Sequence, residues 1–225
     1  GTMYGFKILI RGEYALFSRP EMKVERVSYD VPTPSALAGL ISAIYWHPGV
    51  RYVIDKIVVY RPIDFVNIRR NELSEKVSLR FVRDRMQGKN DGSLYTAEQR
   101  TQRASLLLKD VEYGVEFHFV LTEDAEPGMT EEKCYNILLR RLRKGQFFHK
   151  PCLGCREFPA EVTFAESLPP SALCGETDLG FMLYDLVYQK DAEGNATDRA
   201  EPRFYRPKMR DGVIDVGAYA KELVC

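Results

Sequence analysis

The chain has 225 residues, a length that predicts one large domain or two small ones with room for a real hydrophobic core. Its 32 Lys and Arg balance 32 Asp and Glu, which excludes bulk attraction to a polyanion, so any nucleic-acid face must come from local clustering. No apolar run approaches the roughly 20 residues of a membrane span, and we expect no membrane association.

The first third of the chain predicts a strand, a helix and a second strand. Residues 4–11 alternate apolar and polar side chains, as a strand with one buried face does. Thr33 is a good N-cap, and Pro34 suits the first helical position. Apolar residues then recur at helical spacing until Pro48-Gly49, which stops the helix. Residues 50–66 are rich in Val, Ile and Tyr and predict a strand.

The middle of the chain begins with a long polar insertion. Residues 67–103 hold nine Arg or Lys against five acids, and such long loops are often functional. Residues 106–121 predict another strand. Thr130 then caps a helix whose acidic start and basic end suit the helix dipole, and Gly145 ends it. Residues 153–165 predict a fourth strand of this series.

The order of these elements predicts the fold class. Strand-helix-strand occurs twice, which is typical of an α+β, ferredoxin-like (βαββαβ) domain, as in RNA-recognition modules. We assign this domain to residues 3–168, with 67–103 as its basic insertion. Residues 169–225 are strand-like with one polar turn, and we expect a small antiparallel β extension there.

The cysteines raise the question of a metal site. Five Cys without a secretory signal favour reduced thiols and a cytoplasmic location. His149, Cys152 and Cys155 follow an H-x2-C-x2-C spacing, but zinc normally takes four ligands and a second pair at standard spacing is missing. We therefore favour two small residues near a turn and expect no metal and no cofactor.

Positive charge gathers in residues 133–151, which hold six Lys or Arg and no acid. A solvated helix end that complements the dipole would explain part of this charge. The run continues past the helix into Phe148, His149 and Lys150, and Arg156 follows it. Because Arg and Lys contact phosphates while aromatic rings stack on unpaired bases, the pattern favours an RNA-binding surface.

Three histidines are candidates for acid–base chemistry. His118 lies between two Phe in a predicted strand, which favours a structural role. His47 follows Tyr45-Trp46 at a helix end and can simply bind carbonyl groups there. His149 lies in a basic loop, where nearby positive charge keeps an imidazole neutral and able to act as a base. RNA can be cut without metal when such a base takes the proton of a ribose 2′-OH and cations stabilise the anionic transition state.

Two long motifs carry a family resemblance. "YALFSRPEMKVERVSYDVPTPSALAGLISAIYWHPGVRYVIDKI", residues 14–57, and "KGQFFHKPCLGCREFPAEV", residues 144–162, resemble the two signatures of the Cas five family of CRISPR-associated proteins, in the subtype of type I-C systems. "LGFMLYDLVY", residues 179–188, fits the C-terminal part of that subtype. The resemblance covers nearly the whole chain, with its motifs in the right order.

The resemblance implies an activity and partners. It implies a metal-independent endoribonuclease that cuts precursor CRISPR RNA at the 3′ base of the repeat hairpin by 2′-OH attack. It then implies a subunit that stays on the 5′ handle of the mature crRNA in the surveillance complex (Cascade), beside the other type I-C subunits, with metal-dependent DNA cleavage as a secondary activity. We expect the isolated chain to be a monomer.

The resemblance also implies catalytic residues. Tyr45 matches the family's catalytic Tyr, and Lys133 matches the Lys of a Lys-His pair, but Cys134 stands where the His is expected. Cys134 can act as a base only if its pKa is lowered, and we favour a packing role. We therefore name His149 and His47 as candidates for the missing role. The residues that we expect to bind RNA are Lys23, Arg26, Arg140, Arg141, Arg143, Lys144, Gln146, Phe148, Lys150 and Arg156.

Three other interpretations remain open at this point. Cys134 favours a non-catalytic subunit that only binds the crRNA 5′ handle. A general RNA-binding module without a CRISPR role would show exposed aromatic rings on its sheet and no preference for the repeat hairpin. A zinc-stabilised structural protein would contain near-stoichiometric zinc.

Overall fold

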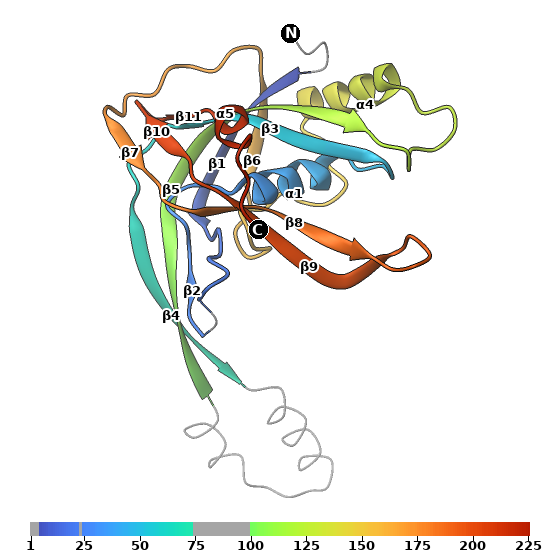
Figure 1. Ribbon diagram of the computed structural model, residues 1–225. Helices are drawn as coiled ribbons and strands as arrows, with labels where there is room; N and C mark the ends of the chain where they lie inside the picture. The colour runs from blue at the N-terminus through green and yellow to red at the C-terminus, as the bar shows by residue number, and fades with distance from the viewer. Residues whose placement is uncertain (1–4, 23, 74–99) are drawn as a thin grey trace, which may run out of the picture.

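A computed structural model describes residues 5–22, 24–73 and 100–225 of the chain (Figure 1). The structure is mixed α/β and is dominated by strands, with few helices among the described residues. Its elements are β1 (Gly5–Ala15), β2 (Arg26–Val27), α1 (Pro34–Ile44), β3 (Val50–Val59), β4 (Phe65–Leu73), β5 (Arg100–Leu121), α4 (Glu131–Lys144), β6 (Glu161–Ala165), β7 (Glu176–Asp178), β8 (Met182–Lys190), β9 (Ala196–Tyr205), β10 (Lys208–Arg210), β11 (Val213–Ile214) and α5 (Val216–Tyr219). No described helix has the length and apolar character that a membrane span requires.

One large sheet organises the described residues. Its strands follow the order β6-β1-β5-β3-β11-β10-β7, and β2 and β4 also pair with β5. β5 lies antiparallel to both β1 and β3, and β6 lies antiparallel to β1. β8 and β9 form a separate two-stranded sheet, which lies beside α1 in Figure 1. The predicted C-terminal extension is therefore divided, because β7, β10 and β11 join the large sheet and only β8 and β9 stand apart.

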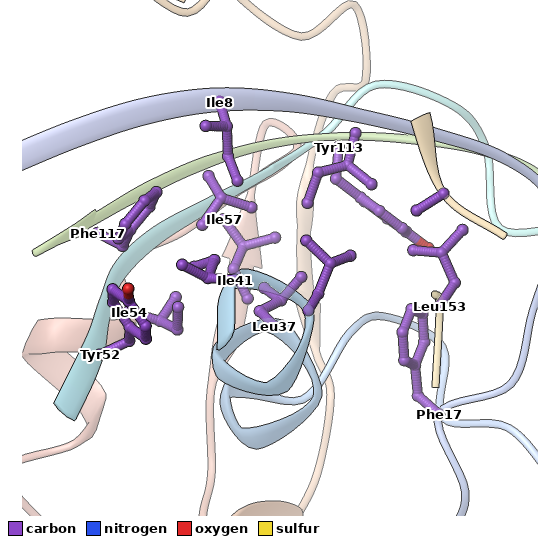
Figure 2. Packing of buried hydrophobic residues seen from close by; sticks show 14 of the residues in the cluster. Ile8, Phe17, Leu37, Ile41, Tyr52, Ile54, Ile57, Tyr113, Phe117 and Leu153 are labelled. Carbon is purple, nitrogen blue, oxygen red and sulfur yellow. The ribbon is translucent and has the colours of Figure 1, made fainter. Parts of the chain in front are cut away.

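The core lies between one face of this sheet and α1. Successive strand residues point to opposite faces, so Ile8 of β1, Ile57 of β3 and Val115 of β5 all face the helix and are fully buried. Leu37 and Ile41 of α1 point toward them, as Figure 2 shows. Full burial of such a side chain stabilises the fold by roughly 1.5–3 kcal/mol relative to exposure, so this layer fixes α1 against the sheet.

Both main helices begin at the predicted caps. The Thr33 hydroxyl accepts a hydrogen bond from the Ala36 amide at 3.1 Å, and the Thr130 hydroxyl accepts one from the Lys133 amide at 3.2 Å. α4 ends at Gly145, which has a left-handed φ of 65° as expected. α1 ends at Ile44, earlier than the Pro48-Gly49 stop, because Tyr45 takes an extended backbone conformation.

The predicted bounds of three further segments also differ from the structure. The strand predicted over 50–66 is two strands, β3 and β4, separated by residues 60–64. The predicted loop 67–103 begins and ends as strand, since β4 and β5 pair from Phe65 with Leu108 to Leu73 with Arg100; its residues 74–99 lie outside the described part of the chain. The hydrophobic pattern does not predict this hairpin, because residues 65–69 of β4 are exposed or half-buried. The strand is held by its backbone hydrogen bonds to β5 rather than by burial of its side chains.

The strand predicted over 153–165 is extended only from Glu161 onward. Residues 151–160 form a compact loop in which the Leu153 amide donates to the Phe158 carbonyl at 2.8 Å. The Leu16 amide at the end of β1 donates to the Leu153 carbonyl at 3.1 Å, which fastens the loop to the sheet. Gly154 makes this contact possible: its φ is +87°, and a Cβ there would collide with the Leu16 carbonyl oxygen.

Gly154→Ala should therefore destabilise the protein by about 3 kcal/mol or more, because it combines an unfavourable φ with a backbone collision. Gly128→Ala is the matched control: Gly128 has a φ of +91° but open space around its Cβ position, so only about 1 kcal/mol should be lost. Thermal unfolding measures both, at about 2–4 °C per kcal/mol for a chain of this size. An equal loss of stability in the two variants would show that the collision between a Cβ at position 154 and the Leu16 carbonyl oxygen does not destabilise the fold.

Candidate functional site

The carbonyl groups at the end of α1 are bound by residues about one hundred positions later in the chain. The Arg141 side chain of α4 donates from Nη1 to the Ile44 carbonyl at 2.7 Å. The amides of Phe148 and His149 both donate to the Ala43 carbonyl, at 3.0 and 2.8 Å. The last carbonyls of a helix lack partners within it, so these bonds fix the end of α1 against the loop after α4.

This arrangement surrounds Tyr45, the residue directly after α1. Tyr45 is 6% exposed, and the Arg141 guanidinium carbon lies 5.1 Å from its ring centroid. The Tyr52 hydroxyl donates to the Tyr45 carbonyl at 2.6 Å. Burial raises the pKa of Tyr45, and nearby Cys134 raises it further, while Arg141 lowers it. A phenol with a raised pKa keeps its proton at neutral pH, so Tyr45 can donate a hydrogen bond but is a poor base.

The pair Lys133-Cys134 lies in the first turn of α4, and its two side chains have different surroundings. Lys133 is exposed, and its ammonium group donates to the Gly128 carbonyl at 2.9 Å. Cys134 is fully buried, and burial raises its pKa to about 11. A thiol in this state is a poor base at neutral pH, so Cys134 is best interpreted as a packing residue.

The two candidate histidines also differ in their surroundings. His47 has both ring nitrogens occupied, because Nδ1 lies 2.7 Å from the Pro48 carbonyl oxygen and Nε2 lies 3.5 Å from a Glu126 carboxylate oxygen. His149 is exposed, its ring meets the Phe148 ring edge to face at a centroid distance of 4.5 Å, and no hydrogen bond to its ring forms within the described residues. His149 is therefore the histidine that can reach a ligand.

Most of the predicted RNA-binding residues lie around the end of α4. Arg141, Gln146 and Lys150 line one pocket of about 310 Å³, together with Ile44 at the end of α1. Arg140, Arg143, Lys144 and Phe148 are exposed beside them. The Arg143 guanidinium carbon lies 5.3 Å from the Phe164 ring centroid, so its charge stays near β6. This group brings cations and an exposed aromatic ring to one surface.

The remaining predicted RNA-binding residues form a second group. Arg26 lies 3.4 Å from a Glu157 carboxylate oxygen and within 3.4 Å of the Ser105 hydroxyl, so part of its charge is neutralised. Arg156 is exposed next to Glu157. Lys23 lies outside the described residues. Glu157 of this second group and Lys150 of the first line one common pocket.

His118, which we expected to be structural, lies on the sheet face opposite α1. Its Nδ1 lies 2.7 Å from an Asp55 carboxylate oxygen. Among the described residues, no group of three or more His, Cys, Asp and Glu has an arrangement that could hold a metal ion. Cys152 and Cys155 are half-buried, and burial raises the pKa of both thiols.

Sequence reasoning missed the parts of the site that are backbone. The Ala43 carbonyl binds the loop after α4, and the Ile44 carbonyl binds Arg141. No side-chain motif in the sequence predicts these two contacts. Tyr52 was also not predicted as a site residue, because the sequence pattern around it is that of an ordinary strand. Only the hydrogen bond from its hydroxyl to the Tyr45 carbonyl connects it to the site.

Comparisons with known proteins agree with one another. The Cas_Cas5d family model, described as CRISPR-associated protein (Cas_Cas5), matches residues 5–217. The CRISPR pre-crRNA endoribonuclease Cas5d of Mannheimia succiniciproducens is 45% identical, with 97% of each chain covered. The protein of the same name from Thermus thermophilus is 40% identical, over 96% of this chain and 93% of that one. A crystal structure described as a CRISPR-associated protein is similar over 100% of both chains, with a TM-score of 0.67 and 25% identity.

The burial of Cys134 predicts slow reaction with thiol reagents. At a pKa of about 11, only about one molecule in a thousand carries the thiolate at pH 8, and no solvent reaches the sulfur. Iodoacetamide at pH 8 should therefore modify the exposed Cys174 and Cys225 in the folded protein and modify Cys134 only after unfolding in denaturant. Mass spectrometry of the digested protein measures each site, and prompt labelling of Cys134 in the folded state would contradict this interpretation.

Proposed function

This chain belongs to the Cas5 family of CRISPR-associated proteins, in its Cas5d group, and we propose that it is the endoribonuclease that cuts precursor CRISPR RNA. The observation that carries the proposal is the arrangement at the end of α1, where the Arg141 side chain meets the Tyr45 ring and the His149 amide binds the Ala43 carbonyl. The chain is also 45% identical over almost its full length to a protein named as such an enzyme. An RNA-cleaving centre needs a proton acceptor, a hydrogen-bond donor and positive charge, and these three side chains supply them.

The proposed fold detail is the ferredoxin-like βαββαβ arrangement. The units β1-α1-β3 and β5-α4-β6 would be its two halves. The strand order β6-β1-β5-β3, with antiparallel neighbours throughout, supports it. In that arrangement both helices cover one face of the sheet, and this is consistent with the direct contact between Arg141 of α4 and the end of α1.

The proposed reaction is a metal-independent attack of a ribose 2′-OH on the adjacent phosphate at the 3′ base of the repeat hairpin. The bond between O2′ and phosphorus forms, and the bond between phosphorus and O5′ breaks. The products are a 2′,3′-cyclic phosphate and a 5′-hydroxyl. His149 would take the proton of the 2′-OH, because its imidazole is exposed and its backbone amide binds the Ala43 carbonyl, two residues before Tyr45.

Tyr45 and Lys133 would act on the phosphate in this reaction. The Tyr45 hydroxyl keeps its proton and donates a hydrogen bond to a phosphate oxygen. Lys133 exchanges its bond to the Gly128 carbonyl for the phosphate, stabilises the developing negative charge and gives a proton to the leaving 5′ oxygen. Arg141 binds the Ile44 carbonyl and the Tyr45 ring, so we assign it a positioning role in addition to its charge.

The basic residues around the end of α4 would hold the RNA. Arg140, Arg143, Lys144 and Lys150 contact phosphates, and Phe148 stacks on an unpaired base. After cleavage, the protein would stay on the crRNA 5′ handle as a subunit of the surveillance complex, as we expect from its family. Metal-dependent DNA cleavage as a secondary activity also remains a proposal.

One alternative has a specific observation in its favour. Cys134 replaces the expected His, and its buried thiol cannot serve as a base, so the chain could be a subunit that binds the 5′ handle without cutting. The two functions differ in a direct assay, because only the enzyme converts the repeat RNA to two products.

The test is cleavage of the cognate repeat hairpin RNA in EDTA. We expect the wild type to cut, and His149→Ala and Lys133→Ala to lower the single-turnover rate about 10²- to 10⁴-fold, as loss of a positioned acid–base group does. Tyr45→Phe should lower the rate with little change in RNA affinity, and a 2′-deoxy nucleotide at the cut site should abolish cleavage. Cys134→Ala should keep the rate of the wild type.

Two histidine variants serve as controls for this assay. His118→Gln changes a histidine on the opposite sheet face and should leave the rate unchanged. His47→Ala tests the other candidate base, and a large loss there with none in His149→Ala would move the catalytic role to His47. Tight binding by the wild type without any cleavage would instead establish the handle-binding alternative.

A further inference from the structure

A second hollow lies on the other side of α1, between this helix and the hairpin of β8 and β9. Its volume is about 720 Å³, within the range of pockets that hold a ligand of nucleotide size. Ser35, Gly39 and Ser42 of α1 line one wall, and Tyr184 and Tyr188 of β8 line the other. We call this hollow the hairpin groove; Figure 1 shows the ribbons of α1 and β8, which border it, side by side.

The helical wall of the hairpin groove leaves the backbone of α1 open to a ligand. The α1 residues that line it are small, and Ser35, Gly39 and Ser42 share one face of the helix because they are spaced by four and three positions. Apart from its chain neighbours and the nearby backbone of α1, no atom of the described residues lies within 4 Å of the point where a Cβ of Gly39 would stand. The groove therefore has free space at its middle.

The opposite wall and the floor supply an aromatic ring and a cation. Tyr188 is 54% exposed, and its ring contacts no other ring within the described residues. Arg203 is paired with Asp185 through Nε at 2.7 Å and Nη2, so its charge is neutralised. Arg51 at the start of β3 is exposed and forms no ion pair with a described residue. The hairpin groove therefore combines a free aromatic face with one uncompensated positive charge.

Residues that line the hairpin groove are close in sequence to both basic groups. Ser42 precedes Ala43, whose carbonyl binds the loop that carries His149. Gly154 also lines the groove, two residues before Arg156 of the second group. A polyanion bound at the candidate active site could follow the hairpin groove from one basic group toward the other.

We propose that the hairpin groove binds unpaired nucleotides that adjoin the repeat hairpin, with a base stacked on Tyr188 and a phosphate bound by Arg51. This inference rests on the proposed function, and it adds the place and the residues that hold the single-stranded RNA. An apolar peptide in the same groove would cover Arg51 without a counterion, which is costly, whereas a phosphate would pair with it. Single-stranded RNA is therefore the occupant that fits the charge.

The experiment measures the affinity of three RNAs, each with a 2′-deoxy nucleotide at the cut site so that it stays intact. They are the hairpin alone, the hairpin with a 5′ single-stranded flank, and the hairpin with a 3′ flank. The variants are Tyr188→Ala, Arg51→Ala and Gly39→Leu. Leu at position 39 fills open space and favours the helix more than Gly does, so the fold should be kept.

Tyr188→Ala should weaken binding of one flanked RNA about 5- to 100-fold and leave the bare hairpin unaffected, because stacking on one base is lost. Gly39→Leu should give a loss of similar size by blocking the space. Arg51→Ala should reduce the slope of log affinity against log salt by about 0.7 for the same RNA. The flank that responds, 5′ or 3′, identifies the segment that occupies the groove.

Two variants control for general effects. Val187→Ala removes an exposed apolar side chain from the same strand outside the groove, and Lys221→Ala removes an exposed cation elsewhere. Both should bind all three RNAs like the wild type. Wild-type affinity of all three groove variants for both flanked RNAs would overturn the groove proposal, as would equal losses on the bare hairpin.

The proposed function is tested separately by cutting of the all-ribose hairpin. If the groove variants bind flanked RNA normally while the wild type still cuts, the groove proposal fails and the proposed function stands. If the wild type neither binds nor cuts repeat RNA, both fail. If Gly39→Leu binds every RNA normally but loses association with a protein partner, the groove belongs to that partner and the RNA proposal is overturned.

Discussion

The capping of α1 by a distant part of the chain is the interaction on which the candidate site depends. A helix leaves its last carbonyl groups without partners, and here Arg141 and the amides of Phe148 and His149 bind two of them. The guanidinium complements the negative end of the helix dipole and also lies over the Tyr45 ring. These contacts thus close the helix, place a cation over the Tyr45 ring and fix the backbone of His149 at the end of α1.

The sheet makes this capping possible because it fixes both helices. Burial of Leu37 and Ile41 holds α1 on the sheet, and Leu138 and Leu142 hold α4, so the end of one helix lies within reach of a side chain of the other. The same burial has a chemical consequence. It raises the pKa of Tyr45 and Cys134, which keeps both groups protonated, and this is why we propose the exposed His149 as the base.

The position of α1 also gives the molecule two candidate functional surfaces. Its end forms the candidate active site, and its outer face forms one wall of the hairpin groove. Small residues such as Ser35 and Gly39 on that face leave space above the helix. Leu37 and Ile41 on the opposite face fill the core. The division follows from helical periodicity, because side chains three and four positions apart share a face.

The sequence by itself determined the local structure and the kinds of chemistry. The alternation in β1, the caps Thr33 and Thr130, and Gly145 at the end of α4 were predicted correctly, because short-range backbone and side-chain physics governs them. The motifs around Tyr45 and His149 also pointed to the family. Only the tertiary structure decided which of these residues meet, since the bonds to Ala43 and Ile44 are made by backbone carbonyls that no side-chain pattern marks. The tertiary structure also decided the pairing of β4 with β5 and the close approach of Gly154 to Leu16. Such contacts between distant segments leave no periodic pattern of apolar residues in the sequence.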